Sequence, residues 1–201
     1  MSERLGKKLV LATRNQDKII EITDILSGLN IDIITLDSFP DIPEIIEDGD
    51  TLEANAEKKA REIHKTTGLP SLADDTGLEV DCINGAPGAY SSRFAGENAT
   101  YAMNNEKLLN KLKDVPRKQR TARFRCVMAI AENGQITFLE GTCHGFILNE
   151  TKGSHGFGYD PLFYVPEYNQ TFAEMPLSLK NKISHRGHAL RKVRQYFEKI
   201  S

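Results

Sequence analysis

Two apolar runs on either side of Glu132-Asn133-Gly134 constrain the fold of this chain more than any other feature. Asn-Gly between apolar runs is a strong signal for a tight β-hairpin, because both residues tolerate the positive φ angles of such a turn. We therefore predict two long paired strands, over residues 121–131 and 135–148. At least part of the sheet must then be antiparallel.

The N-terminal part of the chain instead alternates the periodicities of strands and helices. Strands are predicted at 8–13, at 31–36, and from Ser71 to an end at Asp74-Asp75. Helices are predicted at 18–26, 52–66, 99–113 and 188–199. Early alternation followed by a hairpin predicts an α/β fold with a mixed sheet flanked by helices. Because no linker or repeat interrupts the sequence, we expect a single domain over residues 1–201.

Composition excludes several classes of function. A net charge of −2 gives no reason to expect a nucleic-acid partner or a membrane partner. No apolar run approaches the roughly 20 residues of a membrane-spanning helix, and the N-terminus lacks the apolar core of a signal peptide. Cys82, Cys126 and Cys143 are too far apart for a zinc site or a disulfide framework. We therefore expect a cytoplasmic protein with reduced thiols.

Asp74 and Asp75, followed by Thr76-Gly77, are the strongest candidates for chemistry. Adjacent side chains on an extended chain point to opposite sides, so one carboxylate can face a cleft while the other supports a turn. Carboxylates at a strand end suit Mg²⁺, which combines few protein carboxylates with substrate phosphates. The structural alternative is an Asx turn that closes the strand.

Two other segments are candidates for binding phosphates and a metal ion. Residues 13–18 lie at a predicted strand-to-helix junction, where unpaired amides, a cap from Asn15 and the Lys18 ammonium can bind an anion. The alternative is an ordinary capped helix with a solvated lysine. In the acidic stretch 44–50, Glu47 is preferred to Glu44 as a second metal ligand, with a plain surface loop as the alternative. No Walker A sequence occurs in the chain.

The segment 155–161 suits a flat ligand. Glycines flank Phe157, so its ring can approach a nucleobase and stack on it, and Asp160 can accept a proton from a base or ribose. The alternative is a turn around a buried aromatic ring.

A cationic segment closes a polar loop that is predicted to end with residues 180–187. His185 and Arg186 are donors, and donors favour a keto oxygen over an amino group because an amino group would leave donors facing donors. The alternative is a helix that begins at Ser184 and carries solvated charges.

Four motifs in one order resemble those of the inosine triphosphate pyrophosphatase family. They are T-x-N-x-x-K, ADDTGLEVDxxNGAPGxYSxRFAG, GFGYDPLF and KxxISHRGxAL, and the resemblance runs from Leu9 to about Leu190. It implies an α/β fold with a mixed, curved sheet and two lobes with a cleft between them. It also implies a homodimer that depends on Mg²⁺ and hydrolyses ITP, dITP and XTP to the monophosphate and pyrophosphate.

The resemblance also implies residue roles. Asp75 is the proton acceptor and binds Mg²⁺ together with Glu47, while Glu44 remains an alternative ligand. The residues implied to bind the purine nucleoside triphosphate are Thr13, Arg14, Asn15, Gln16, Asp17, Lys18, Thr76, Phe157, Gly158, Tyr159, Asp160, Lys180, His185 and Arg186.

Three other functions remain open at this point. A nucleotide-binding regulator would keep the phosphate and base segments but would not need Asp75 and an acidic partner. A pyrophosphatase for pyrimidine or methylated nucleotides should lack the combination of Phe157 with His185-Arg186. If the chain is instead an α/β interaction domain, the presence of four polar, glycine-rich segments has to be a coincidence.

Overall fold

The structure is a computed structural model that describes residues 7–199. The strands are β1 (Lys7–Leu11), β2 (Ile31–Ile34), β3 (Ser71–Val80), β4 (Thr121–Glu132), β5 (Gln135–Ile147), β6 (Phe163–Val165) and β7 (Gln170–Thr171). The α-helices are α1 (Gln16–Leu26), α2 (Leu52–Thr67), α3 (Tyr101–Leu112), α4 (Leu177–Ile183) and α5 (His185–Lys199). No helix within this described part is both long and apolar enough to cross a bilayer.

The described residues form two compact units. Unit 1 comprises residues 7–75, 127–140 and 189–199, and unit 2 comprises residues 76–126 and 141–188. The strands β3, β4 and β5 each contribute residues to both units. Whether the two units act as the single predicted domain stays a prediction.

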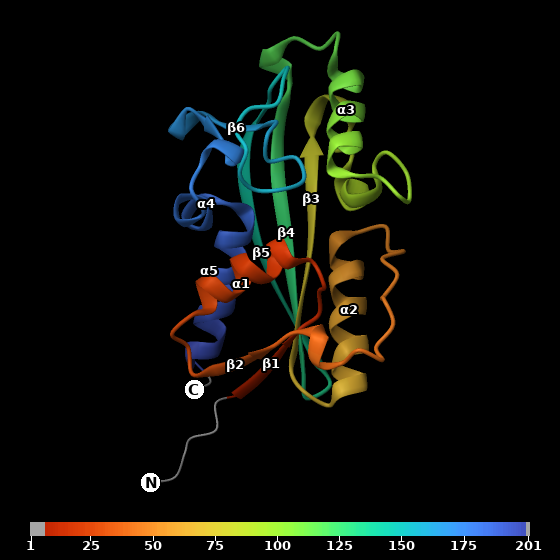
Figure 1. Cartoon of the computed structure of the whole chain (residues 1–201), viewed down its shortest axis with the longest axis vertical. Coiled ribbons are helices and arrows are strands. Elements are labelled where there is room, and N and C mark those ends of the chain that lie inside the picture. Colours follow the sequence, from red (N-terminus) through yellow and green to blue (C-terminus); the bar gives the residue numbers. More distant parts are fainter. Residues whose placement is uncertain (1–6, 200–201) are drawn as a thin grey trace. The chain divides into compact units, whose positions relative to one another are not determined.

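The strands are hydrogen-bonded in the order β2-β1-β3-β4-β5-β6-β7. β1 is parallel to β2 and to β3, whereas β6 is antiparallel to β5 and to β7. The predicted mixed sheet flanked by helices is therefore confirmed. In unit 1 the chain passes from β1 outward to β2 and then back to β3. Right-handed crossovers in opposite directions place α1 and α2 on opposite faces of these strands, as Figure 1 shows.

Local signals in the sequence fix the predicted hairpin and the predicted caps of α1 and α2. β4 and β5 are joined by Asn133 and Gly134, whose φ angles are 52° and 77°. Both angles are positive, as a type I′ turn requires. The Asn15 side chain accepts a hydrogen bond from the Lys18 amide and caps α1. Thr51 caps α2 in the same way.

Each unit has a buried core of its own. In unit 1 the core includes the apolar run of β1 and buried residues of three helices, namely Leu9, Val10, Leu11, Ile22, Leu26, Ile63, Val193 and Phe197. In unit 2 one apolar cluster contains Leu78, Leu108, Phe124, Phe163 and Phe172. The rings of Phe124 and Phe163 lie 4.7 Å apart. These cores hold in place the strands and helices that carry the polar residues described below.

Two predicted boundaries are wrong. β3 does not end at Asp74-Asp75 but continues to Val80, because Leu78 and Val80 are fully buried and extend the strand into the core of unit 2. The predicted polar loop that ends with residues 180–187 is instead α4 followed directly by the first turn of α5.

The helical structure there has a local cause. Leu179 and Ile183, four residues apart on α4, both pack against the core cluster of unit 2. Ser184 then begins α5, because its Oγ accepts a hydrogen bond of 3.1 Å from the Gly187 amide. The alternative prediction, that Ser184 caps a helix, is thus correct for the cap.

Candidate functional site

Asp74 and Asp75 lie side by side on β3 and engage two different helices of unit 1. The Asp74 carboxylate forms an ion pair with Lys18 of α1, with Nζ and Oδ1 2.9 Å apart. The Asp75 carboxylate accepts a 3.0 Å hydrogen bond from the amide of Asn55 on α2. Successive strand side chains point to opposite faces, so each carboxylate meets the helix on its own face. Because β3 continues past both residues, the Asx-turn alternative is wrong.

The side chain of Lys59 on α2 contacts three acidic residues of unit 1, Glu47, Asp74 and Asp75. This lysine is 6% exposed, and its Nζ donates hydrogen bonds to Glu47 Oε1 and, at 2.6 Å, to the main-chain oxygen of Asp74. The same Nζ lies 3.8 Å from Asp75 Oδ1. One buried cation therefore stands beside the carboxylates of Glu47 and Asp75, whereas the Glu44 side chain is exposed.

Burial and neighbouring charges shift the pKa values of the Asp75 and Glu47 carboxyl groups in opposite directions. Desolvation raises the pKa of Asp75 to about 6, and the nearby Glu47 charge acts in the same direction, against Lys59, Lys18 and the Asn55 hydrogen bond. For Glu47, burial would raise the pKa, but Lys59 and Lys18 together lower it below its usual value. A carboxylate with a pKa near neutrality is suited to accept a proton at cellular pH.

A short relay of amides supports Asp75. The main-chain N–H of Gly49 donates to Asn55 Oδ1 at 2.8 Å, and Asn55 then donates to Asp75. A Cβ at position 49 would lie 2.7 Å from that Asn55 oxygen, so the glycine permits the close approach. The acidic stretch before α2 is thereby tied to the Asp75 side chain.

Sequence reasoning missed both Asn55 and Lys59. They are four residues apart on α2, on the buried face that also carries Ala56, Ala60 and Ile63. Two polar residues within an apolar helical stripe are the signal that could have found them, because buried polar groups require partners.

Asn55→Ala is expected to raise the pKa of Asp75 above about 6, because the Asn55 hydrogen bond stabilises the charged carboxylate. The Asp75 carboxyl carbon, titrated by NMR, measures this shift directly. Lys58→Ala is the control, because Lys58 lies on the same helix and its exposed ion pair is with Asp48, which precedes α2. A lower or unchanged pKa in Asn55→Ala would contradict this role.

The carboxylates of Glu47 and Asp75 fit a hard divalent cation. Within residues 7–199, no group of three or more His, Cys, Asp or Glu residues is arranged to hold a metal ion. Mg²⁺ does not need such a cage, because it commonly takes one or two carboxylates and completes its shell with water and substrate phosphates. The ammonium group of Lys59 beside both carboxylates indicates that positive charge is stabilised at this position.

The segment before α1 presents an anion-binding end of a helix. Thr13 Oγ1 accepts a hydrogen bond from the Asn15 amide, and Asn15 caps the helix. The Arg14 guanidinium donates to the main-chain oxygen of Ile42 at 2.8 Å and so binds the neighbouring loop. The N-terminus of α1 carries partial positive charge, to which the Lys18 ammonium adds.

Two other predicted residues of that segment, Gln16 and Asp17, lie on the exposed first turn of α1. Asp17 places an acidic group where the helix dipole favours one. The structure thus brings Lys18 to Asp74, while Gln16 and Asp17 face solvent.

In unit 2, Asp160 organises the loop that carries Phe157. Its Oδ2 accepts a hydrogen bond of 2.9 Å from the Phe157 amide and one of 2.6 Å from Lys180 Nζ. A Cβ at Gly156, whose φ is 71°, would come within 2.2 Å of that oxygen. Asp160 is 3% exposed, so this oxygen holds the loop and Lys180 rather than facing solvent.

Tyr159 also supports the loop from inside. Its ring belongs to the core cluster of unit 2, and its hydroxyl donates to the main-chain oxygen of Ser91 at 2.9 Å. The neighbouring Gly158 oxygen accepts a 3.0 Å hydrogen bond from Asn105 of α3.

Two cations lie over the Phe157 ring. Lys180 Nζ is 4.7 Å and the Arg186 guanidinium carbon 5.5 Å from the ring centroid. Arg186 also donates a 3.1 Å hydrogen bond to Thr76 Oγ1. The His185 ring stacks on Phe124 at 4.5 Å. The alternative of solvated charges is therefore wrong, because Lys180, His185 and Arg186 are all at most 3% exposed.

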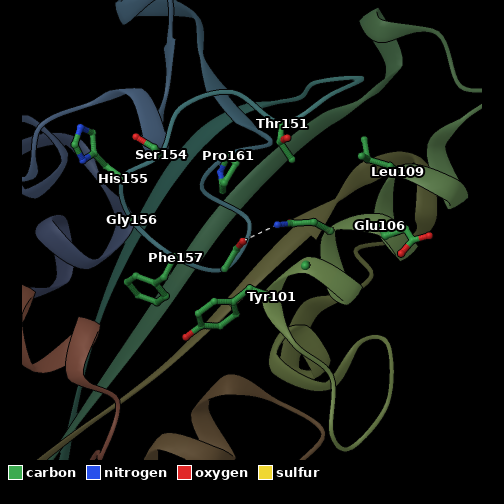
Figure 2. A pocket seen from close by; sticks show the side chains of 12 residues that line it. Tyr101, Glu106, Leu109, Thr151, Ser154, His155, Gly156, Phe157 and Pro161 are labelled. Atoms are coloured by element: carbon green, nitrogen blue, oxygen red, sulfur yellow. Dashed lines mark hydrogen bonds between the residues drawn. The ribbon is translucent and has the colours of Figure 1, made fainter.

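A cavity of about 440 Å³ lies beside the Phe157 loop, between α3 and residues 151–161. Figure 2 shows Tyr101 of α3 and Phe157 with their rings close together at one end of it. The two centroids are 6.0 Å apart and the planes are inclined by 42°. Leu109 lies at the other end of the cavity (Figure 2), and Pro161 also lines it.

The predicted residues thus form two sets. One set, in unit 1, combines carboxylates, the buried Lys59, the partly buried Lys18 and a helix N-terminus, and suits a phosphate chain with a divalent cation. The other set, in unit 2, combines an aromatic ring with buried cationic donors, and suits a flat, oxygen-bearing heterocycle. The chain itself links the sets, because Asp75 of the first and Thr76 of the second are consecutive residues of β3.

Known proteins match this chain over nearly its whole length. The model of the Ham1 family matches residues 9–196. A dITP/XTP pyrophosphatase of Desulforamulus reducens is 54% identical over 194 residues, which cover 96% of this chain and 96% of that protein. Another of that name, from Geobacter sulfurreducens, is 53% identical over 91% of this chain and 92% of its own. A solved HAM1 protein from Coxiella burnetii superimposes with a TM-score of 0.88 at 42% identity, over 96% of this chain and 99% of that one.

Proposed function

The chain belongs to the Ham1 family, and on that premise we propose that it is a nucleoside triphosphate pyrophosphatase for deaminated purine nucleotides. The relatives named dITP/XTP pyrophosphatase support this assignment, since they match over nearly the full length of both chains. The proposed reaction converts ITP, dITP or XTP and water to the nucleoside monophosphate and pyrophosphate. Such an enzyme keeps these nucleotides out of DNA and RNA.

The triphosphate is proposed to bind to the set of residues in unit 1. Lys18 and the positive end of the α1 dipole favour the negative charge of the phosphates. Asp75 and Glu47 are the proposed ligands of Mg²⁺, and Lys59 keeps the two carboxylates together. When bound there, Mg²⁺ supplies neutralisation of the phosphate charge that otherwise repels a nucleophile.

Asp75 is the proposed proton acceptor, and its position is the observation that carries the mechanism. The buried carboxylate lies 3.8 Å from Lys59 Nζ and accepts a hydrogen bond from Asn55, and burial raises its pKa to about 6. The ionised carboxylate orients a water molecule and accepts its proton. The water oxygen forms a bond to the α-phosphorus, and the bond from this phosphorus to the oxygen bridging to the β-phosphate breaks. Pyrophosphate leaves with that oxygen, and Lys18 stabilises its charge.

The base is proposed to bind to the set of residues in unit 2. Phe157 provides a stacking surface, and Lys180, His185 and Arg186 are the proposed donors. Hypoxanthine and xanthine carry a 6-keto oxygen that such donors can satisfy, whereas the amino group of adenine would place donors against donors. Thr76, which accepts from Arg186, is the link from the base set to Asp75.

The direct test is pyrophosphate release from ITP, XTP, dITP, GTP, ATP and dUTP, with Mg²⁺ and with EDTA. We expect strong release from ITP, dITP and XTP that EDTA abolishes, and little release from GTP or ATP. Binding of ITP without release from any nucleotide would instead identify a regulator. Preference for dUTP would indicate a pyrimidine pyrophosphatase.

Arg186→Ala is expected to reduce kcat/KM for ITP by about tenfold or more, because the variant loses a charged donor to the base. The kcat/KM for ATP should change less, so the ratio of the two constants is the measurement. An equal loss for both nucleotides would show that Arg186 does not read the base. Arg191→Ala, outside both sets of site residues, is the control.

Three remaining parts of the proposal rest on the composition and pattern of the sequence. They are one domain that contains both units, a cytoplasmic location, and the lack of a nucleic-acid or membrane partner. The homodimer and the small-molecule purine nucleotide substrate rest on the resemblance of the sequence motifs.

A further inference from the structure

We propose that Tyr101 and Asn105 of α3 are positioning residues that hold the base-binding loop, residues 155–160, and thereby set the affinity for the purine base. The inference rests on the proposed function, because it concerns the specificity of the same site. Neither residue belongs to the motifs that the sequence analysis identified.

The two residues contact consecutive positions of the loop. They are four apart on α3, so their side chains lie on one face of the helix. Asn105 Nδ2 donates to the Gly158 oxygen at 3.0 Å, and the Tyr101 ring lies 6.0 Å from that of Phe157 (Figure 2 shows the two rings). One face of α3 therefore holds both the backbone of the loop and its aromatic ring.

These contacts matter because a cavity of about 440 Å³ separates α3 from much of residues 151–161. The loop contains Gly156 and Gly158, with φ angles of 71° and 62°, and glycines give a backbone many alternative conformations. A loop with this freedom beside a cavity needs fixed points. Asn105 is well suited to be one, because it is 8% exposed and its hydrogen bond to the loop is partly buried.

Displacement of the loop should affect one end of the substrate. Phe157 is the ring over which Lys180 and Arg186 lie, so a shift of this ring disturbs the surface that receives the base. Asp75, Glu47 and Lys18 belong to the other set of residues, in unit 1, whereas Tyr101 and Asn105 lie in unit 2. Displacement of this loop is therefore expected to weaken the binding of the base and to leave the binding of the phosphates unchanged.

The experiment compares two pairs of variants. Asn105→Asp keeps the shape of the side chain but removes the donor, and Glu106→Gln on the same wall of the cavity is its control. Tyr101→Leu removes the aromatic ring, and Tyr101→Phe retains it. We expect Asn105→Asp and Tyr101→Leu to raise KM for ITP by about threefold to tenfold with nearly constant kcat. Tyr101→Phe and Glu106→Gln should match the wild type.

Calorimetric binding of ITP and of inorganic triphosphate, in the presence of EDTA, separates this inference from the proposed function. Weaker binding of ITP but not of triphosphate supports the positioning role even if the wild type hydrolyses nothing, an outcome that would refute only the proposed function. Equal losses for both ligands, unchanged ITP affinity, or the same loss in Tyr101→Phe as in Tyr101→Leu would overturn the inference. The Tyr101 pair decides the matter if Asn105→Asp fails to fold.

Discussion

Asp75→Asn is expected to lower the rate of pyrophosphate release from ITP by about 10²-fold to 10⁴-fold, the range that a positioned general base contributes. The substitution preserves the size of the side chain, and its oxygen can still accept the hydrogen bond from Asn55. It removes the capacity to take up a proton and the negative charge that would bind a divalent cation. Single-turnover measurement of pyrophosphate release at saturating ITP tests the chemical step.

The same residue predicts the pH dependence of the wild type. Because the ionised form of Asp75 is the active one, kcat/KM should rise with pH and level off above about 6. This acidic limb should be absent from the residual activity of Asp75→Asn. A variant with near-normal turnover would remove Asp75 from catalysis. Asp32→Asn, an exposed carboxylate on β2, should leave turnover unchanged.

Stability should respond in the opposite direction to activity. The pKa of Asp75 is raised from 3.8 to about 6, so the folded protein binds the proton more tightly than the unfolded chain does. The contribution of Asp75 to stability is therefore present below about pH 4 and is lost as the pH rises through about 6. Asp75→Asn lacks this ionisation. Its Tm relative to the wild type should be higher at about pH 8 than at about pH 4.

Lys180→Met is expected to reduce the free energy of unfolding by about 3–5 kcal/mol, because it leaves the buried Asp160 carboxylate without its ammonium partner. The side chains of both residues are 4% exposed, so water cannot replace the lost ion pair. Chemical denaturation monitored by circular dichroism measures the change. Lys182→Met, on the exposed side of the same helix, should change stability by less than about 0.5 kcal/mol.

A double variant distinguishes the ion pair from simple loss of packing. Asp160→Asn removes the buried charge but leaves an oxygen to accept the Phe157 amide. Adding Asp160→Asn to Lys180→Met should therefore recover part of the lost stability. If the double variant is no more stable than Lys180→Met, the uncompensated charge is not the cause.

Where the signal is local, the sequence was sufficient to predict the fold. Asn133-Gly134 predicts its own turn, because the two residues tolerate the φ angles that the hairpin needs, and Asn15 and Thr51 cap the helices that follow them. The end of β3 was misplaced because Thr76-Gly77 resembles a turn in isolation. Only the core of unit 2, which buries Leu78 and Val80, extends the strand.

The site residues also fall into those that a local sequence pattern reveals and those that depend on tertiary packing. Motif residues such as Asp75, Lys18 and Phe157 could be selected from the sequence because their residue types and spacing suit a nucleotide. Asn55 and Lys59 could not be selected, since their value depends on which face of α2 meets β3. The burial of Lys180 was missed for a related reason, because no local pattern indicates that Asp160, twenty positions earlier, is its partner.

Unit 1 draws its core from three separate stretches of the chain, and this has a consequence during protein synthesis. The first 75 residues supply Lys18, Lys59 and Asp75, but Val193 and Phe197 of α5 complete the apolar core around β1. A ribosome that has made only the first 75 residues has therefore made these site residues without the core residues of α5 that support them. The site should become rigid only after translation passes residue 197, so an interrupted nascent chain should be inactive and susceptible to proteolysis.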